Sequence, residues 1–160
     1  MKYHITKKRF KFLEDNFFEF SFEGREPDRT IFDGIEKPEE LHVIAWFHNW
    51  DDGAEVLNWI VNSPVCDSGT AKLIFWRSQP DYYTTFSSEE DAGSNADVYC
   101  LLRTIIQNFE DGFYKKHEIA YDPNTDEGAP MDIDYRDPEE KWEIPSWMKV
   151  PVQGGDILVS

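Results

Sequence analysis

The pattern of hydrophobic and polar positions is clearest between Leu41 and Trp76, where it predicts three short helices separated by two corners. In the first of these helices, Leu41, Ile44, Ala45 and His48 recur at the spacing of one helix face. The buried stripes of the other two helices are Val56, Trp59 and Ile60, and then Ala71, Ile74 and Phe75. We therefore expect Trp59 and Trp76 to be core residues, with Trp46 and Trp50 packed in the first corner.

Both corners carry residues that begin or end helices. The first corner spans residues 49–53, and Asp52 with Glu55 has the spacing of a capping box. The second corner spans residues 63–69, where Pro64 stops one helix and Asp67 precedes the next apolar run. These local signals place the helix boundaries.

A fourth helix is predicted from about Asn95 to Phe109, because large apolar residues again share one face. Residues 87–95 contain no large apolar residue and are expected to form an exposed loop.

Strands are predicted on either side of the helical region. Phe18, Phe20 and Phe22 alternate with polar residues, which favours a half-buried strand, with a hairpin around residues 14–16 as one arrangement. A short helix also fits, since Phe17 breaks the alternation. A second strand is expected where His117, Ile119 and Tyr121 alternate.

These elements predict one helix-dominated α+β domain over residues 1–160, with an antiparallel helical core and a few peripheral β-strands. Its parts are a variable N-terminal strand or hairpin segment (1–35), the helical core (36–110), and a strand with an acidic tail (111–160).

Charge narrows the possible partners. The chain has 32 acidic and 16 basic residues, for a formal net charge of -16. Such a surface repels nucleic acid and anionic membranes, and it speeds encounter with a basic partner. The alternative is that acidity only maintains solubility. No signal sequence and no membrane-spanning run is visible, so we expect a cytoplasmic protein.

No metal or cofactor site is expected from the residue spacings. Cys66 and Cys100 lack a Cys-x-x-Cys partner and are expected to be reduced thiols. His42 and His48 are six positions apart, on different faces of a helix. Residues 122–133 begin like a calcium loop but lack its glycine and its final glutamate.

Acidic residues gather in two places that remain candidates for function. Asp51 and Asp52 resemble a catalytic acid pair, although capping explains neighbouring acids at a helix start better. The loop-like tail from Tyr121 to Glu143 has nine acids against two bases. We expect the end of this tail to be pinned to the body by Trp142, Ile144, Trp147 and Met148.

The two corners also carry a resemblance. Asn49-Trp50-Asp51-Asp52-Gly53, followed by the pattern P-x-C-D-x-G-T-A from Pro64 to Ala71, resembles the bacterial domain-of-unknown-function family 4274. The likeness covers residues 41–76 well and extends loosely to Phe109 and to residues 142–145. The family implies no catalytic residues. Its helix-corner-helix pattern is similar to helical-repeat units that present a binding surface, and small acidic proteins of this kind resemble bacterial immunity proteins.

Two functional hypotheses follow. In the first, the protein is an acidic immunity or inhibitor protein that binds and neutralises a cognate, basic bacterial toxin domain. Its expected contact residues are acidic: Asp51, Asp52, Asp132, Asp134, Asp137, Glu139 and Glu140. In the second, it is a hydrolase or metal-dependent enzyme that uses the Asp51/Asp52 pair or the carboxylates between Asp122 and Asp134. A toxin gene directly upstream would support the first hypothesis, and a metabolic operon the second.

Overall fold

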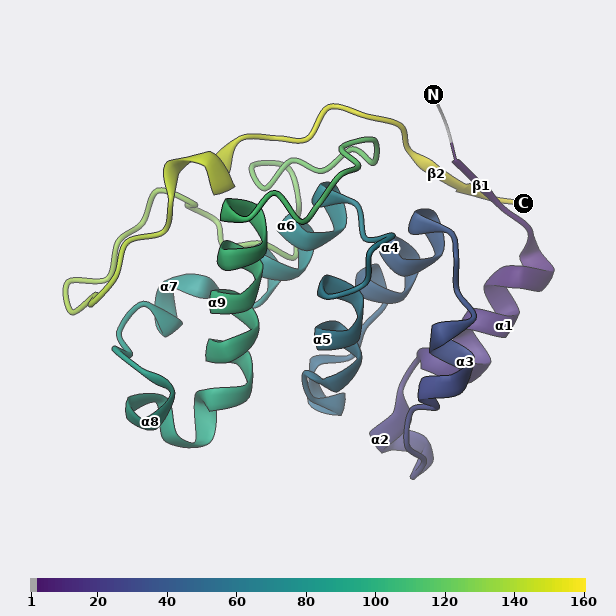
Figure 1. The fold of residues 1–160 in the computed structure, drawn as a ribbon, viewed down its shortest axis with the longest axis horizontal. Coiled ribbons are helices and arrows are strands. Elements are labelled where there is room, and N and C mark those ends of the chain that lie inside the picture. The colour runs from purple at the N-terminus through teal and green to yellow at the C-terminus, as the bar shows by residue number, and fades with distance from the viewer. Residues whose placement is uncertain (1–2) are drawn as a thin grey trace.

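The computed structural model describes residues 3–160, and Figure 1 shows their arrangement. Helices make up most of the ordered elements, as the α+β prediction expects. In chain order the elements are β1 (Tyr3–Ile5), α1 (Lys7–Phe17), α2 (Phe20–Glu23), α3 (Arg29–Asp33), α4 (Pro38–Trp46), the 3-10 helix η1 (Trp50–Asp52), α5 (Glu55–Val61), α6 (Ser68–Arg77), α7 (Pro80–Tyr83), α8 (Glu89–Ala92), η2 (Gly93–Asn95), α9 (Ala96–Glu110), η3 (Ser146–Lys149) and β2 (Ile157–Val159). The prediction of a helix-dominated α+β fold is confirmed.

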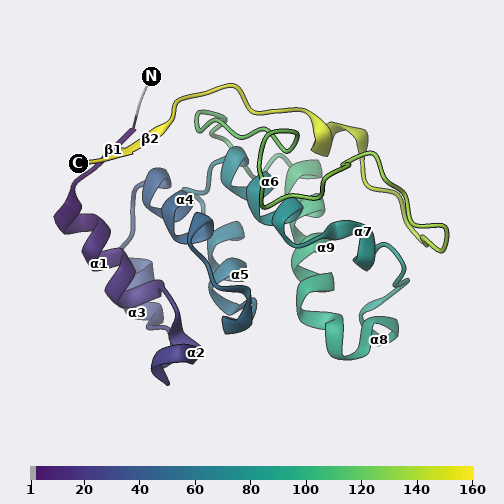
Figure 2. The same cartoon turned by 180° about the vertical axis from the view of Figure 1, so that it is seen from behind.

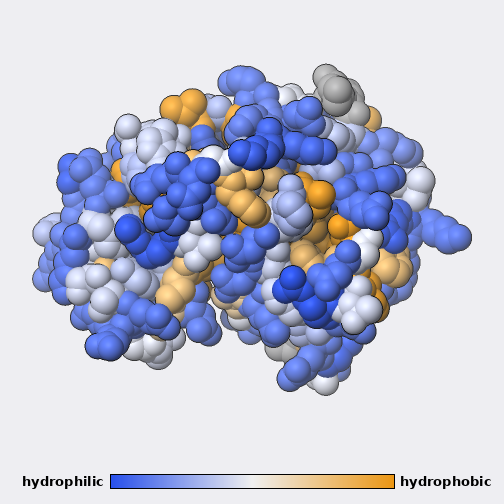
Figure 3. All heavy atoms as spheres, in the orientation of Figure 1, coloured by the Kyte–Doolittle hydropathy of each residue, from blue (hydrophilic) through white to orange (hydrophobic). Residues whose placement is uncertain are grey.

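Helix α6 is the centre of the core. It packs against α4, α5 and α9, and its residues from Ser68 to Trp76 are all buried. Because α6 is covered on every side, its polar side chains Ser68, Thr70 and Lys72 are buried as well, and each has a hydrogen-bond partner. The outer helices bury one face each, and Leu41, Ile60 and Leu102 contribute to the shared core. The face shown in Figure 3 is largely hydrophilic, with apolar patches between the helices.

The predicted N-terminal strand and hairpin are wrong, because this segment forms α1 and α2. Thr6 caps α1 by accepting a hydrogen bond from Arg9 N at 3.1 Å. Leu13 and Phe17 are spaced i, i+4 on the buried face of α1, so the helical period prevails over the alternation that follows it. The chain then turns at Glu19, whose φ of 55° lies in the left-handed region.

The predicted loop over residues 87–95 is also partly helical. Ser88 caps α8 by accepting a hydrogen bond from Asp91 N at 3.1 Å, and acids fill the first turn. Acidic side chains at a helix N-terminus are favourable through the helix dipole. A polar, capped turn therefore forms where the absence of large apolar residues predicts only a loop.

Strand pairing differs from the prediction at residues 117–121. In place of a continuous strand there are isolated bridges, from Ile119 to Gly155 and from Tyr121 to Val152. Among the residues described, the one regular sheet joins β1 and β2 in parallel, from Tyr3 beside Ile157 to Ile5 beside Val159. Both views of the ribbon show β1 and β2 side by side (Figures 1 and 2).

The second corner clamps the segment around Ile119 to the helical core. The Asp67 carboxylate accepts hydrogen bonds from Gly69 N (2.8 Å), Glu118 N (2.7 Å) and Ile119 N (3.2 Å). A Cβ on Gly69 would overlap the carbonyl oxygen of Ile119, and a Cβ on Gly154 would overlap that of Glu118. Two glycines therefore let the segment pass between α6 and the C-terminal strand region.

The first corner is not closed by the predicted capping box. Asp52 Oδ2 accepts a hydrogen bond from Phe20 N at 3.0 Å, and α5 begins after Ala54 without a side-chain cap. Asp52 therefore ties the corner to α2. Two of the predicted core tryptophans also differ: Trp59 is only half-buried, and Trp46 is exposed, whereas Trp76 is fully buried as predicted.

The acidic tail is held against α7 and the core. Lys141 N donates to Thr84 O at 2.7 Å, and the indole N–H of Trp142 donates to Tyr83 O at 3.2 Å. Met148 is fully buried, and its carbonyl oxygen accepts the Trp76 indole N–H at 2.9 Å. The predicted pinning holds: Trp142 and Ile144 pack against the core, and the Trp147 ring, although 37% exposed, meets the Phe109 ring at 5.3 Å.

Candidate functional site

The most exposed aromatic pair on the helical core is Trp46 and Phe47, where α4 ends. Their exposed fractions are 45% and 48%. Helix α4 buries every residue from Glu40 to Ala45, and exposure begins at Trp46, where the helix ends. We call this pair the aromatic ridge.

An apolar hollow of about 320 Å³ lies along one side of the ridge. It separates α4 from the C-terminal strand region and is lined by His42, Val43, Trp46, Phe47, Ile119, Ala120, Gly155, Asp156, Ile157 and Val159. Apolar side chains dominate this lining, and Asp156 is the acid at its rim. Such a hollow is suited to apolar side chains.

His42 contributes a neutral side chain to the apolar hollow. Its Nδ1 lies 2.8 Å from Thr70 Oγ1 in the interior. Burial, and to a smaller extent the nearby Arg77 guanidinium, lowers the pKa of His42 to about 4. At neutral pH the imidazole is therefore uncharged and fits an apolar surface.

An acidic hollow of about 370 Å³ lies on the other side of the ridge, between α1 and α2. Its lining consists of Phe10, Lys11, Glu14, Asp15, Phe18, Glu19, Glu23 and Phe47. The Phe47 ring stacks on Phe18 and meets Phe10 edge-on, with both centroid distances 5.4 Å. The ridge is thus anchored to α1 by aromatic contacts, and four acids surround it.

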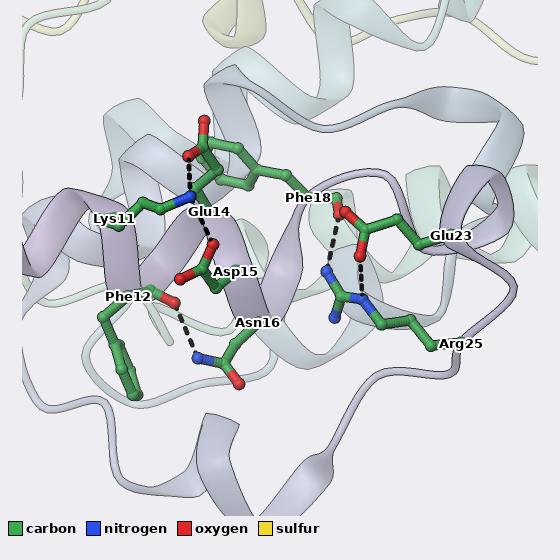
Figure 4. A network of polar contacts seen from close by, with 8 residues as sticks. All are labelled: Lys11, Phe12, Glu14, Asp15, Asn16, Phe18, Glu23 and Arg25. Atoms are coloured by element: carbon green, nitrogen blue, oxygen red, sulfur yellow. Dashed lines mark hydrogen bonds and ion pairs between the residues drawn. The ribbon is translucent and has the colours of Figure 1, made fainter.

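Figure 4 shows how the charges of the acidic hollow are arranged. Lys11 Nζ lies 3.2 Å from Glu14 and 2.9 Å from Asp15, and Arg25 pairs with Glu23 at 2.6 Å. Two bases thus partly offset three of the acids. No ion pair of the described residues involves Glu19, so the hollow keeps a net negative charge.

Arg77 packs on the Trp46 ring and fixes its position. The guanidinium carbon lies 3.9 Å from the indole centroid, and Arg77 also donates to the Trp46 carbonyl oxygen at 2.9 Å. Asp126 fixes the same guanidinium through two hydrogen bonds of 2.9 and 2.8 Å. A cation stacked on indole and locked by a carboxylate pre-organises the ridge.

The predicted acidic contact residues fall into two separate groups. Asp51 is exposed, and Asp52 joins the first corner to α2 beside the acidic hollow. The other five lie in the tail, which Figures 1 and 2 show at the opposite end of the molecule from α2. Asp52 therefore lies next to the segment that lines the acidic hollow, whereas the tail acids lie apart from it.

Most of the tail acids are engaged locally. Asp132 and Asp137 accept hydrogen bonds from the backbone of Asp134 and Glu139. Asp134 also pairs with Lys149 at 3.0 Å, and Glu140 pairs with Arg136. These contacts are those of a folded acidic loop.

Ser68 and His117 form a pair that resembles part of a catalytic triad. Their Oγ and Nδ1 atoms lie 2.7 Å apart, and Asp67 is adjacent in sequence. However, Ser68 is buried, and the Asp67 oxygens accept backbone N–H groups, so no oriented nucleophile faces solvent.

The two cysteines and the potential metal ligands were also compared with the requirements of thiol and metal sites. Cys66 and Cys100 are free cysteines, and burial raises the pKa of the Cys66 thiol. Within residues 3–160, no cluster of three or more His, Cys, Asp or Glu side chains is placed to hold a metal ion. In the same range, no helix combines the length and apolar character that crossing a bilayer requires.

The pattern along α4 contains a signal for the ridge that the sequence reasoning missed. Trp46 and Phe47 stand directly before the polar corner of residues 49–53, and an apolar pair at the end of a helix is more open to solvent than one in its middle. The acids of the second hollow, such as Glu19 and Glu23, carry no such signal. They meet Phe47 only because α1 and α2 fold back onto α4.

Comparison with known proteins identifies the helical part of the chain. Residues 36–109 match the model of a family described as Domain of unknown function (DUF4274). No curated protein and no solved structure matches the chain. The matched range runs from the residues before α4 nearly to the end of α9, and it includes both corners and the ridge. The matched stretch, 74 of the 160 residues, is therefore similar to the DUF4274 family.

Proposed function

We propose that this protein is an acidic immunity or inhibitor protein that binds and neutralises a cognate, basic bacterial toxin domain. The observation that carries the proposal is the aromatic ridge of Trp46 and Phe47, exposed between two hollows. Aromatic residues dominate the binding energy of protein interfaces when they enter pockets at the centre of the contact.

Charge supports a basic partner. The net charge is -16, and acids lie at the rims of both hollows beside the ridge, among them Glu19, Glu23 and Asp156. A negative rim around an apolar centre accelerates encounter with a positive surface and disfavours other partners. A toxin that acts on nucleic acid would present such a basic surface, and an acidic inhibitor would compete with its substrate.

Rigidity also supports binding through the ridge. Arg77 and Asp126 fix the Trp46 indole, and Phe10 and Phe18 fix the Phe47 ring. Side chains that are already ordered lose little conformational entropy on association.

The alternative of a carboxylate enzyme gains no specific support. Asp52 accepts the backbone N–H of Phe20, and Asp122 accepts that of Asn124 within its own loop. Asp126 is occupied by Arg77 and Tyr121. A general acid and base need an opposed pair facing a substrate cavity.

The test uses the protein encoded directly upstream of this gene. Binding is measured by calorimetry, and neutralisation by growth on co-expression. We expect Trp46→Ala and Phe47→Ala to weaken binding by about 30-fold or more, the effect of a hot-spot residue. The matched control is Tyr135→Ala, an equally exposed aromatic (49%) in the tail, which should change affinity less than about threefold.

Two outcomes would contradict the proposal. One is that the upstream protein neither binds nor is neutralised. The other is that the ridge variants, folded by circular dichroism, bind as tightly as the unmodified protein.

A further inference from the structure

The strand β2 has one bonded edge and one open edge. Tyr3 N donates to Asp156 O at 2.8 Å, and Ser160 N donates to Ile5 O at 3.1 Å. In a parallel pair, alternate residues of a strand face the partner, so the even-numbered residues of β2 bond to β1. The N–H and C=O groups of Ile157 and Val159 therefore point the other way. Within residues 3–160, no hydrogen bond joins them to another group.

Residues 118–120 pair with Gly155, just before β2, and then turn away from the strand. Gly155 N donates to Glu118 O at 2.8 Å, and Ala120 N donates to Gly155 O at 3.1 Å, on the side to which Ile157 and Val159 also point. The chain then turns, and Tyr121 pairs in the opposite direction with Val152. The position next to Ile157 and Val159 in the sheet is therefore vacant.

The apolar hollow lies beneath this vacant position. Ile157 and Val159 line the hollow together with Val43 and Trp46, whereas Leu158 points to the opposite face and is 46% exposed. Side chains of a strand alternate between its two faces. A third strand beside β2 would thus place every second side chain in the hollow, against the aromatic ridge.

The acidic residues near the open edge of β2 favour a basic partner segment. Asp156 borders the edge, and Asp122 lines a further hollow that shares Asp156 and Trp46 with the first. Residues 152–160 contain no lysine or arginine, which proteins use to guard exposed edges. A second copy of this chain also has a net charge of -16, so electrostatic repulsion disfavours pairing of two copies at this edge.

We infer that β2 accepts an extended segment of a partner protein, with apolar residues alternating with basic ones, as an added strand. This is recognition by strand addition, in which backbone bonds give affinity and a pocket for alternate side chains gives specificity. The inference rests on the proposed function, because it names how the cognate toxin would engage the ridge.

The first test is hydrogen exchange of the intact protein with a synthetic probe. The probe is an octapeptide of alternating lysine and valine with blocked ends, and the control peptide has glutamate in place of lysine. In the free protein, the amides of Ile157 and Val159 should exchange faster than those of Leu158 and Ser160, which bond to β1. The lysine peptide should slow exchange at Ile157 and Val159 by about tenfold or more, and the glutamate peptide should not.

The second test compares Val159→Pro with Val159→Ala. Proline removes an N–H that makes no bond to β1, so the β1–β2 pairing should persist. Alanine keeps that N–H and shortens the side chain. We expect Val159→Pro to bind the lysine peptide about tenfold more weakly than Val159→Ala at similar melting temperatures.

The inference fails if the lysine peptide does not bind at about 1 mM, protects neither amide, or binds both variants equally. It also fails if the upstream toxin binds through Trp46 while both amides exchange as in the free protein. That last result would leave the proposed function intact. A toxin that does not bind, together with a lysine peptide that still protects both amides, would remove the proposed function and leave the strand-addition site.

Discussion

Tryptophan side chains in this chain are buried to different extents, and burial decides what each contributes to stability. Trp76 is 1% exposed, and its N–H donates to the carbonyl oxygen of Met148. Trp59 is half-buried beside Arg29 and Phe32. We expect Trp76→Ala to lower the free energy of unfolding by about 3–5 kcal/mol, and Trp59→Ala by less than half as much. Urea denaturation measures both. Equal losses would contradict this ranking.

His42 should make stability depend on pH in the acidic range. Its pKa is about 4 in the folded protein against 6.5 for an ordinary histidine, because burial disfavours the charged form. Between these values the unfolded chain binds more protons, so the contribution of His42 is complete above pH 6.5 and declines as the pH falls toward 4. The full loss is about 3 kcal/mol.

The measurement compares urea unfolding of the unmodified protein and of His42→Gln between pH 4 and 7. Glutamine retains a polar partner for Thr70 but does not titrate. The variant should lose less stability on acidification than the unmodified protein. Parallel pH profiles would show that His42 is not responsible.

Among the elements, the clamp between α6 and residues 118–120 is the most sensitive to side-chain size. A methyl group on Gly69 would overlap the Ile119 carbonyl oxygen, whereas one on Gly34 would meet its nearest atom at 3.4 Å. We expect Gly69→Ala to cost about 2–3 kcal/mol of stability, the range of overpacking, and Gly34→Ala to cost less than about 1 kcal/mol. Thermal unfolding of the two variants checks this. Similar melting temperatures would contradict it.

The elements differ in how far the sequence predicts them. Helices α5 and α9 follow from local periodicity, because each buries residues at helical spacing, whereas α6 is recognised by its apolar residues and its Asp67 cap. The N-terminal phenylalanines fit two periods at once, and only packing of Leu13 and Phe17 against the core selects the helix. Asp67 and Gly69 are recognisable as a corner, but their partners Glu118 and Ile119 lie far along the chain. The site depends on the same distant contacts.

At the scale of the whole molecule, distance from the ridge should decide which acids matter. We compare the neutralised rim set Glu19→Gln, Glu23→Gln and Asp156→Asn with the neutralised tail set Asp132→Asn, Asp134→Asn and Asp137→Asn. Charges are screened over about 30 Å at 0.01 M salt and about 8 Å at 0.15 M. Both sets should therefore slow association with the upstream toxin at low salt, but only the rim set should do so strongly at 0.15 M.

Stopped-flow kinetics at the two salt concentrations measures these rates. A tail set that dominates at 0.15 M would place the partner over the tail. Association rates that change with neither the salt concentration nor the substitutions would show that the acidic residues serve solubility.

The pairing of β1 with β2 also sets an order of events in time. Tyr3–Ile5 are made before the described helices, and their partners Ile157–Val159 are made after them. The helical core can form while synthesis continues, since its contacts are complete earlier in the chain. The open edge of β2 forms only when residues 157–159 have been made and paired with β1. Until residues 157–159 have been made, the chain therefore has no such edge to offer to a toxin or to its neighbours.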